Sequence, residues 1–183
     1  PLSHAGMVKS ILNLISESPR QSENDRFRKR KDLEKRSPGS MKNLPFRKYY
    51  ATNKDSSISD ILFHFFNSVK ESFKYDTDNS YWDFDPESMK ITNILHTTVG
   101  YHALLEILLD ILPDIPEGER YLTTTYRKYT DKFSNLPIAD VTHYPFTSKS
   151  KTIFYLDMSL LLTPPVNTTD SRVLKLKDLL RRV

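Results

Sequence analysis

A run of cations around one aromatic residue has the clearest binding chemistry in the sequence. Residues 20–36 hold eight Lys or Arg against four Asp or Glu, a surplus equal to the formal charge of +4 of the whole chain. The cations are densest at Arg26, Arg28, Lys29, Arg30 and Lys31. This block would bind DNA well if it met it, because each neutralised phosphate releases counterions and adds affinity. The alternative is a solvated linker or helix face, in which the interleaved carboxylates pair with the cations.

Two further segments combine cations with aromatic residues. Arg47 and Lys48 precede two tyrosines, and Arg127 and Lys128 belong to a tyrosine-rich segment over residues 118–133. Rings can stack on bases while cations hold phosphates. The first segment could equally be an ordinary amphipathic strand or loop, and the aromatic stripe of the second is more typical of core residues. We include these four cations in the predicted DNA-binding set.

No complete catalytic or metal-binding motif is visible. The chain has no cysteine, which excludes thiolate chemistry, and its four glycines are too scattered for a phosphate loop. We therefore predict no cofactor and no metal. A lone His64 beside an apolar helix face is more typical of a structural role. An enzyme would need a pocket assembled around His96 or His102, so we expect the chain to be non-catalytic by itself.

The acidic stretch after residue 75 invites a calcium hypothesis. Counted from Asp76, an EF-hand loop would require glycine where Tyr81 stands. The stretch is better interpreted as a polar turn, with Trp82 and Phe84 folding back on the core and Pro86 opening the next helix.

Hydrophobic periodicity predicts a mainly α fold, with room for one or two short strands that would make it α+β. The clearest helix spans residues 57–73 and starts with Ser57 as its cap. Residues 97–112 are apolar on most of their circumference and should form the centre of the core, with Thr97 or Thr98 as cap and Gly100 allowing close approach. A third helix is expected over 118–133. Residues 152–162 fit a strand or a helix, and a short basic docking helix should follow Asp170.

Length and composition indicate one compact domain. With 183 residues, 38% of them hydrophobic, the chain can build a single core. Pro and Gly within residues 37–40 predict a boundary between an N-terminal helix with its basic arm or linker, residues 1–40, and a helical core domain, residues 41–183. The lack of cysteine and of any long apolar run fits a cytoplasmic protein with no membrane partner. The chain begins at Pro1 without a methionine, and we expect it to be a processed product or part of something longer.

The middle of the chain resembles a known family. A phenylalanine-rich helix from Ile58 to Lys70, then Trp82, then Thr97-Thr98-Val99-Gly100 followed by an Ala-Leu-Leu helix, is similar to the later half of DGQHR-domain proteins, over about residues 58–112. The resemblance implies a relative of the ParB and sulfiredoxin fold, found beside DNA phosphorothioation and other bacterial defence genes, where some members act as regulators. The name-giving Asp-Gly-Gln-His-Arg string is absent, so no activity that depends on it is expected.

Two hypotheses follow. The first is a DNA-associated accessory or regulatory domain of a bacterial DNA-modification or phage-defence system, which binds phosphates through its basic arm. The second is a protein interaction or scaffold domain whose apolar helix faces, above all residues 173–180, dock on a protein partner or on a missing half of the same protein.

Overall fold

The computed structural model describes residues 3–33, 44–83 and 90–181, and these segments are mainly helical. The described residues form eight α-helices: α1 (His4–Leu12), α2 (Pro19–Arg26), α3 (Arg47–Ala51), α4 (Asp55–Ser72), α5 (Thr98–Ile111), α6 (Thr123–Thr130), α7 (Ser148–Leu162) and α8 (Ser171–Arg181). Their only extended pairing is an isolated bridge between Lys74 and Ser80. The predicted mainly α fold is confirmed.

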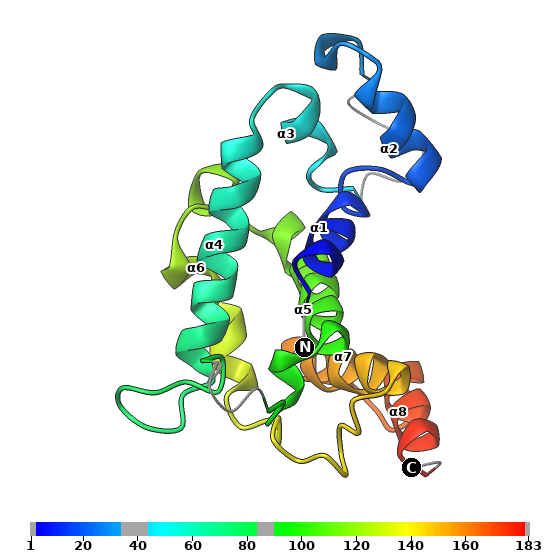
Figure 1. The fold of residues 1–183 in the computed structure, drawn as a ribbon. Helices are drawn as coiled ribbons and strands as arrows, with labels where there is room; N and C mark the ends of the chain where they lie inside the picture. The colour runs from blue at the N-terminus through cyan, green and yellow to red at the C-terminus, as the bar shows by residue number, and fades with distance from the viewer. Residues whose placement is uncertain (1–2, 34–43, 84–89, 182–183) are drawn as a thin grey trace.

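Helix α5 lies at the centre, packed against α7 and α1 (Figure 1). Its side chains Leu104, Ile107 and Leu108 are fully buried. The Thr97 hydroxyl accepts a hydrogen bond of 3.0 Å from the amide of Gly100 and so caps the helix. A Cβ atom at Gly100 would overlap the carbonyl oxygen of Ile94. The predicted cap, close approach and central position are all confirmed.

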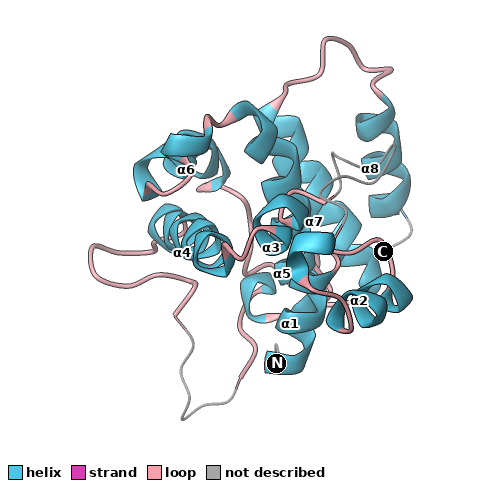
Figure 2. Cartoon of the chain, turned by 90° about the horizontal axis from the view of Figure 1, so that it is seen from above, coloured by secondary structure: helices cyan, strands magenta, loops and turns pink. Residues whose placement is uncertain are grey.

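Helix α4 runs beside α6, as both views show (Figures 1 and 2). Its buried stripe contains Ile58, Ile61 and Phe65, as the periodicity predicts. The predicted Ser57 cap is wrong, because the helix begins at Asp55 and Ser57 already lies in its first turn. The carboxylate of Asp55 instead places negative charge at the positive helix end.

The predicted helix over 118–133 is shorter in the structure. A 3-10 turn, η4 (Glu117–Glu119), precedes α6, and a second turn, η5 (Asp131–Phe133), follows it. Tyr126 and Phe133 are fully buried, which confirms the core interpretation of the aromatic stripe. Leu122 is 51% exposed, because it precedes the helix and never joins that stripe.

The two long elements near the C-terminus, α7 and α8, are both helices. Residues 148–162 form α7, whose Ile153, Phe154 and Met158 are buried, so the helix alternative is the correct one. Helix α8 packs on α7, with Leu176 and Leu179 against the core. The predicted docking helix therefore docks on its own chain.

The acidic stretch forms a polar turn, as predicted. The Asp76 carboxylate accepts hydrogen bonds from the backbone amides of Asp78 and Asn79, at 2.9 and 2.7 Å. Trp82 returns to the core, with its ring centroid 5.4 Å from that of Phe66. The predictions for Phe84, Pro86 and the boundary at 37–40 lie outside the described residues.

Within the described segments, no helix is both long and apolar enough to cross a bilayer. The same segments contain no cluster of three or more His, Cys, Asp or Glu placed to hold a metal ion.

Candidate nucleic-acid interface

The basic block forms a short loop at the end of α2. Ser18 caps this helix by accepting a hydrogen bond of 3.2 Å from the amide of Gln21, and Pro19 occupies its first turn. The helix ends at Arg26, and a 3-10 turn, η1 (Arg30–Asp32), follows. We call residues 26–31 the basic loop. It lies at the end of the molecule opposite α8 (Figure 1).

A buried ion pair fixes the start of the basic loop. Asp25 and Arg47 are 6% and 3% exposed, and the Arg47 guanidinium donates hydrogen bonds to both carboxylate oxygens of Asp25. An arginine fork bound to both oxygens of a carboxylate holds distance and orientation together. The pair therefore ties α2 to α3. Arg47, one of the cations predicted to contact phosphate, is instead an internal clamp.

A second clamp holds the other end of the basic loop. Arg30 donates to both carboxylate oxygens of Asp55, each at 2.7 Å, and its guanidinium carbon lies 4.2 Å from the centroid of the Tyr50 ring. The hydrogen bond to Asp55 raises the pKa of Arg30 above its usual value. Just beyond, Leu33 is buried at 4% exposure. Arg30 thus joins the loop to α3 and to the start of α4, with its charge already matched.

The remaining cations of the loop point outward. Arg26, Arg28, Lys29 and Lys31 are all exposed, and none of them forms an ion pair with another described residue. Phe27, between two of these arginines, is 85% exposed. The two clamps therefore present four cations and one phenyl ring on a fixed base. Glu23 and Asp32, both exposed, weaken the positive field around them.

The other predicted cations lie elsewhere and face carboxylates. Lys48 is 3.5 Å from Glu117. On α6, Lys128 is 3.9 Å from Glu119, and Arg127 contacts Glu71 at 3.3 Å and Asp131 at 3.2 Å. Helices α6 and α2 lie on different sides of the molecule in both views (Figures 1 and 2). The structure thus separates Arg127 and Lys128 from the basic loop, and phosphate contacts by them stay a prediction.

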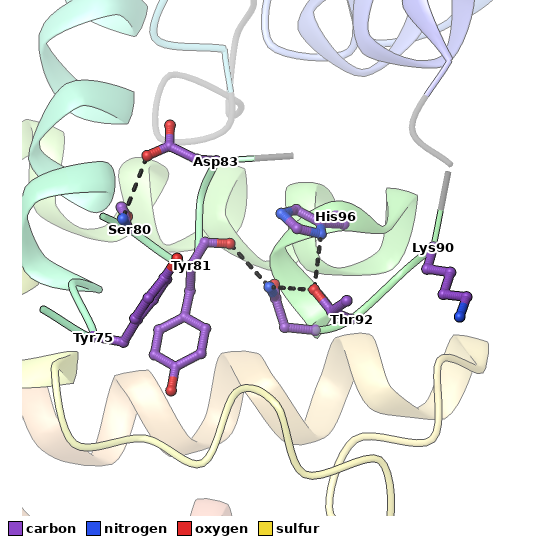
Figure 3. Close-up of a pocket in the computed structure, with 8 residues that line it drawn as sticks. Tyr75, Ser80, Tyr81, Asp83, Lys90, Thr92 and His96 are labelled. Atoms are coloured by element: carbon purple, nitrogen blue, oxygen red, sulfur yellow. Dashed lines mark hydrogen bonds between the residues drawn. The ribbon is translucent and has the colours of Figure 1, made fainter. Parts of the chain in front are cut away.

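A polar pocket of about 250 Å³ surrounds His96 (Figure 3). Its polar groups largely satisfy one another: the Asn93 amide donates to the carbonyl oxygen of Tyr81 at 2.9 Å, and Thr92 lies 3.5 Å from the Nδ1 atom of His96. Burial lowers the pKa of His96. The contacts of this pocket therefore serve to join Tyr81 to the segment that contains Asn93 and His96.

A second pocket, of about 280 Å³, surrounds His102 between α1, α5 and α7. The Ser10 hydroxyl lies 2.6 Å from the Nε2 atom of His102 and donates to the Gly6 carbonyl oxygen at 2.8 Å. A hydroxyl has one proton. The Ser10 hydroxyl can therefore donate to the Gly6 carbonyl oxygen or to His102 but not to both, and the direction of its bond to His102 depends on the tautomer of the ring.

The wall of this pocket carries a charge pair. Lys151 lies 2.7 Å from Glu106. Burial, and next the positive charge of Lys151, lower the pKa of His102. The pocket can therefore offer a neutral imidazole beside a matched ion pair.

The two clamps were not predicted from the sequence, nor was the row of polar residues that α5 presents to α7. The spacing of four between His102, Glu106 and Asp110 on α5 could have revealed a shared helix face. Their partners on α7, Lys151 for Glu106 and Tyr155 for Asp110, are 45 residues away in each case, and no local pattern identifies them.

Comparison of the chain with family models, curated proteins and solved structures gave no match. The resemblance to DGQHR-domain proteins therefore stays a prediction.

Proposed function

We propose that the protein is a DNA-associated accessory domain that holds phosphates with its basic loop and has no catalytic activity of its own. The observation that supports this proposal is the exposure of Arg26, Arg28, Lys29 and Lys31 on a loop clamped at both ends. A loop whose backbone is already held in place loses less freedom when its cations bind a phosphate. A regulatory role in a bacterial DNA-modification or defence system belongs to the same proposal and rests on the family resemblance.

The charge distribution favours this loop over the other predicted cations. Arg30 and Arg47 are already paired with Asp55 and Asp25 in the two clamps. Each of Lys48, Arg127 and Lys128 lies within 4 Å of a carboxylate. A cation must break such an ion pair before it can bind a phosphate, and this reduces the free energy gained on binding. The four outward cations of the loop have no such cost among the described residues.

The test is fluorescence anisotropy of labelled DNA at ~50 and ~200 mM salt. If four cations meet phosphates, the fourfold rise in salt should lower affinity for duplex DNA by about a hundredfold. Replacing Arg26, Arg28, Lys29 and Lys31 with alanine should abolish most of the binding and flatten the salt dependence.

A matched variant removes the same charge elsewhere. Lys74, Lys132, Lys175 and Lys177 are exposed and outside the loop, so their replacement with alanine should change affinity only modestly. If both variants lost the same affinity for DNA, the binding would depend on net charge alone and not on the basic loop. No binding by the wild type at low salt would refute the proposal.

A protein interaction role is the second candidate, and one observation favours it. Phe63 on α4 and Leu122 before α6 are 62% and 51% exposed, and their chain neighbours His64 and Thr123 are hydrogen-bonded at 2.9 Å. Exposed apolar side chains on neighbouring elements are typical of protein contacts. The region 173–180 offers less, because Leu176, Leu179 and Leu180 already pack on the core. Self-association lost on Phe63→Glu would support this candidate.

A further inference from the structure

Phe27 is a large apolar side chain with no packing role. It is 85% exposed, and it follows the last residue of α2 with its amide 3.2 Å from the Asn24 carbonyl oxygen. The side chains of α2 itself are polar apart from Pro19, so the ring does not continue an apolar face. Folding gains almost nothing from a ring left in water.

The backbone on both sides of Phe27 is held in place. Asp25, two residues earlier, is clamped by Arg47, and Arg30, three residues later, is clamped by Asp55 and Tyr50. The amide of Arg28 also donates to the Asp25 carbonyl oxygen at 3.2 Å. The ring therefore stands on an ordered base between Arg26 and Arg28.

We infer that Phe27 stacks on an unpaired base, so that the basic loop prefers single-stranded nucleic acid to duplex. This inference rests on the proposed function, which it makes more specific. In a duplex, both faces of an internal base are covered by its neighbours, and only the phosphates remain within reach of the loop. In a single strand, a base can turn onto the ring while the adjacent cations hold the flanking phosphates.

An anionic membrane surface is the competing partner for a ring among cations. Helices that lie in a bilayer interface present a broad apolar face. Helix α2 has none, and the loop carries a single phenyl ring. The structure thus favours base stacking over insertion into lipid.

The test compares oligothymidine with a mixed-sequence duplex of the same length, by anisotropy at ~50 mM salt. Phe27→Ala should weaken binding to oligothymidine by roughly 5- to 150-fold and leave duplex binding nearly unchanged. The salt dependence of the remaining binding should not change, because the phosphate contacts stay. Phe27→Trp should retain the preference, and the added indole fluorescence should be quenched by oligothymidine beyond the quenching of the wild type, which contains only Trp82.

Val166→Ala is the control, because Val166 is 99% exposed and lies between α7 and α8, outside the loop. It should leave both affinities unchanged. Thermal unfolding should confirm that Phe27→Ala folds normally, as its exposure predicts.

The outcomes separate this inference from the proposed function. Salt-dependent binding with equal affinity of wild type and Phe27→Ala for oligothymidine would overturn the stacking inference and leave the phosphate contacts standing. No binding to either DNA at low salt would refute both. Phe27-dependent binding to phosphatidylserine vesicles without DNA binding would also overturn both and assign the loop to membranes.

Discussion

Arg47 and Asp25, 22 residues apart in sequence, face each other inside the protein as a two-pronged ion pair. The pair joins α2 to α3 beneath the basic loop. The sequence predicts Arg47 as a DNA-binding residue because it precedes two tyrosines. In the structure, Arg47 instead holds in place the loop that carries the exposed cations. Its partner Asp25 lies within residues 20–36, so the basic stretch supplies the acidic member of the clamp as well as the exposed cations.

Removal of one member of this pair should be costly. Asp25→Ala leaves the Arg47 charge buried without its carboxylate, and we expect the free energy of unfolding to fall by about 3–5 kcal/mol. Urea denaturation measures this change. Asp32→Ala, at an exposed position of the same region, should change stability by less than about 0.5 kcal/mol. A loss below about 1 kcal/mol for Asp25→Ala would show that the pair is dispensable.

The approach of α5 to Ile94 should tolerate no side chain at Gly100. The Cβ atom of Gly100→Ala would overlap the carbonyl oxygen of Ile94, which is backbone and cannot move alone. Overpacking of this kind costs about 1–3 kcal/mol or more. Gly118→Ala is the natural control, because no atom lies within 4 Å of its added Cβ. Thermal unfolding of both variants should show a large loss for the first and almost none for the second.

Arg172 should hold α8 on α7. Its guanidinium donates to the carbonyl oxygens of Ser159 at 3.1 Å and Thr163 at 2.9 Å, at the C-terminal end of α7. We expect Arg172→Ala to lower protection of α8 amides by about 1 kcal/mol in hydrogen exchange. Lys175→Ala, on the exposed side of α8, should leave that protection unchanged. Equal protection in Arg172→Ala would show that the apolar contacts of α8 suffice.

Stability should fall as the solution becomes acidic, partly through His102. Burial lowers the pKa of His102 below its usual 6.5, so between the folded and unfolded values the unfolded chain binds more protons. The free energy of unfolding therefore rises with pH across that window, and the contribution of His102 is lost progressively as pH falls from about 6.5 to its folded pKa.

His102→Gln should flatten this decline, measured as the urea midpoint at pH 7.5 and at pH 5.5. His96, whose pKa burial also lowers, should account for a further part, so the double variant should be flatter still. A decline as steep in His102→Gln as in the wild type would exclude this contribution.

Local sequence alone determined the helical character of the protein and several details of its core. The stripe of Ile58, Ile61 and Phe65 repeats with the period of a helix, and the Thr97 hydroxyl reaches an amide three residues away. Such features depend on spacings within one or two turns, which the chain carries in its own order. Over residues 152–162 the local sequence fits a strand and a helix alike, because its β-branched and aromatic residues suit both.

Tertiary structure alone decided which cations are available. Arg30 and Lys31 are adjacent in sequence, yet one is bound to Asp55 and the other is exposed. The partner of Arg30 is 25 residues away in the sequence, and the partner of Arg47 is 22 residues away. Their positions follow from how α2, α3 and α4 pack, because burial and pairing of a charge depend on distances between elements that no local periodicity encodes.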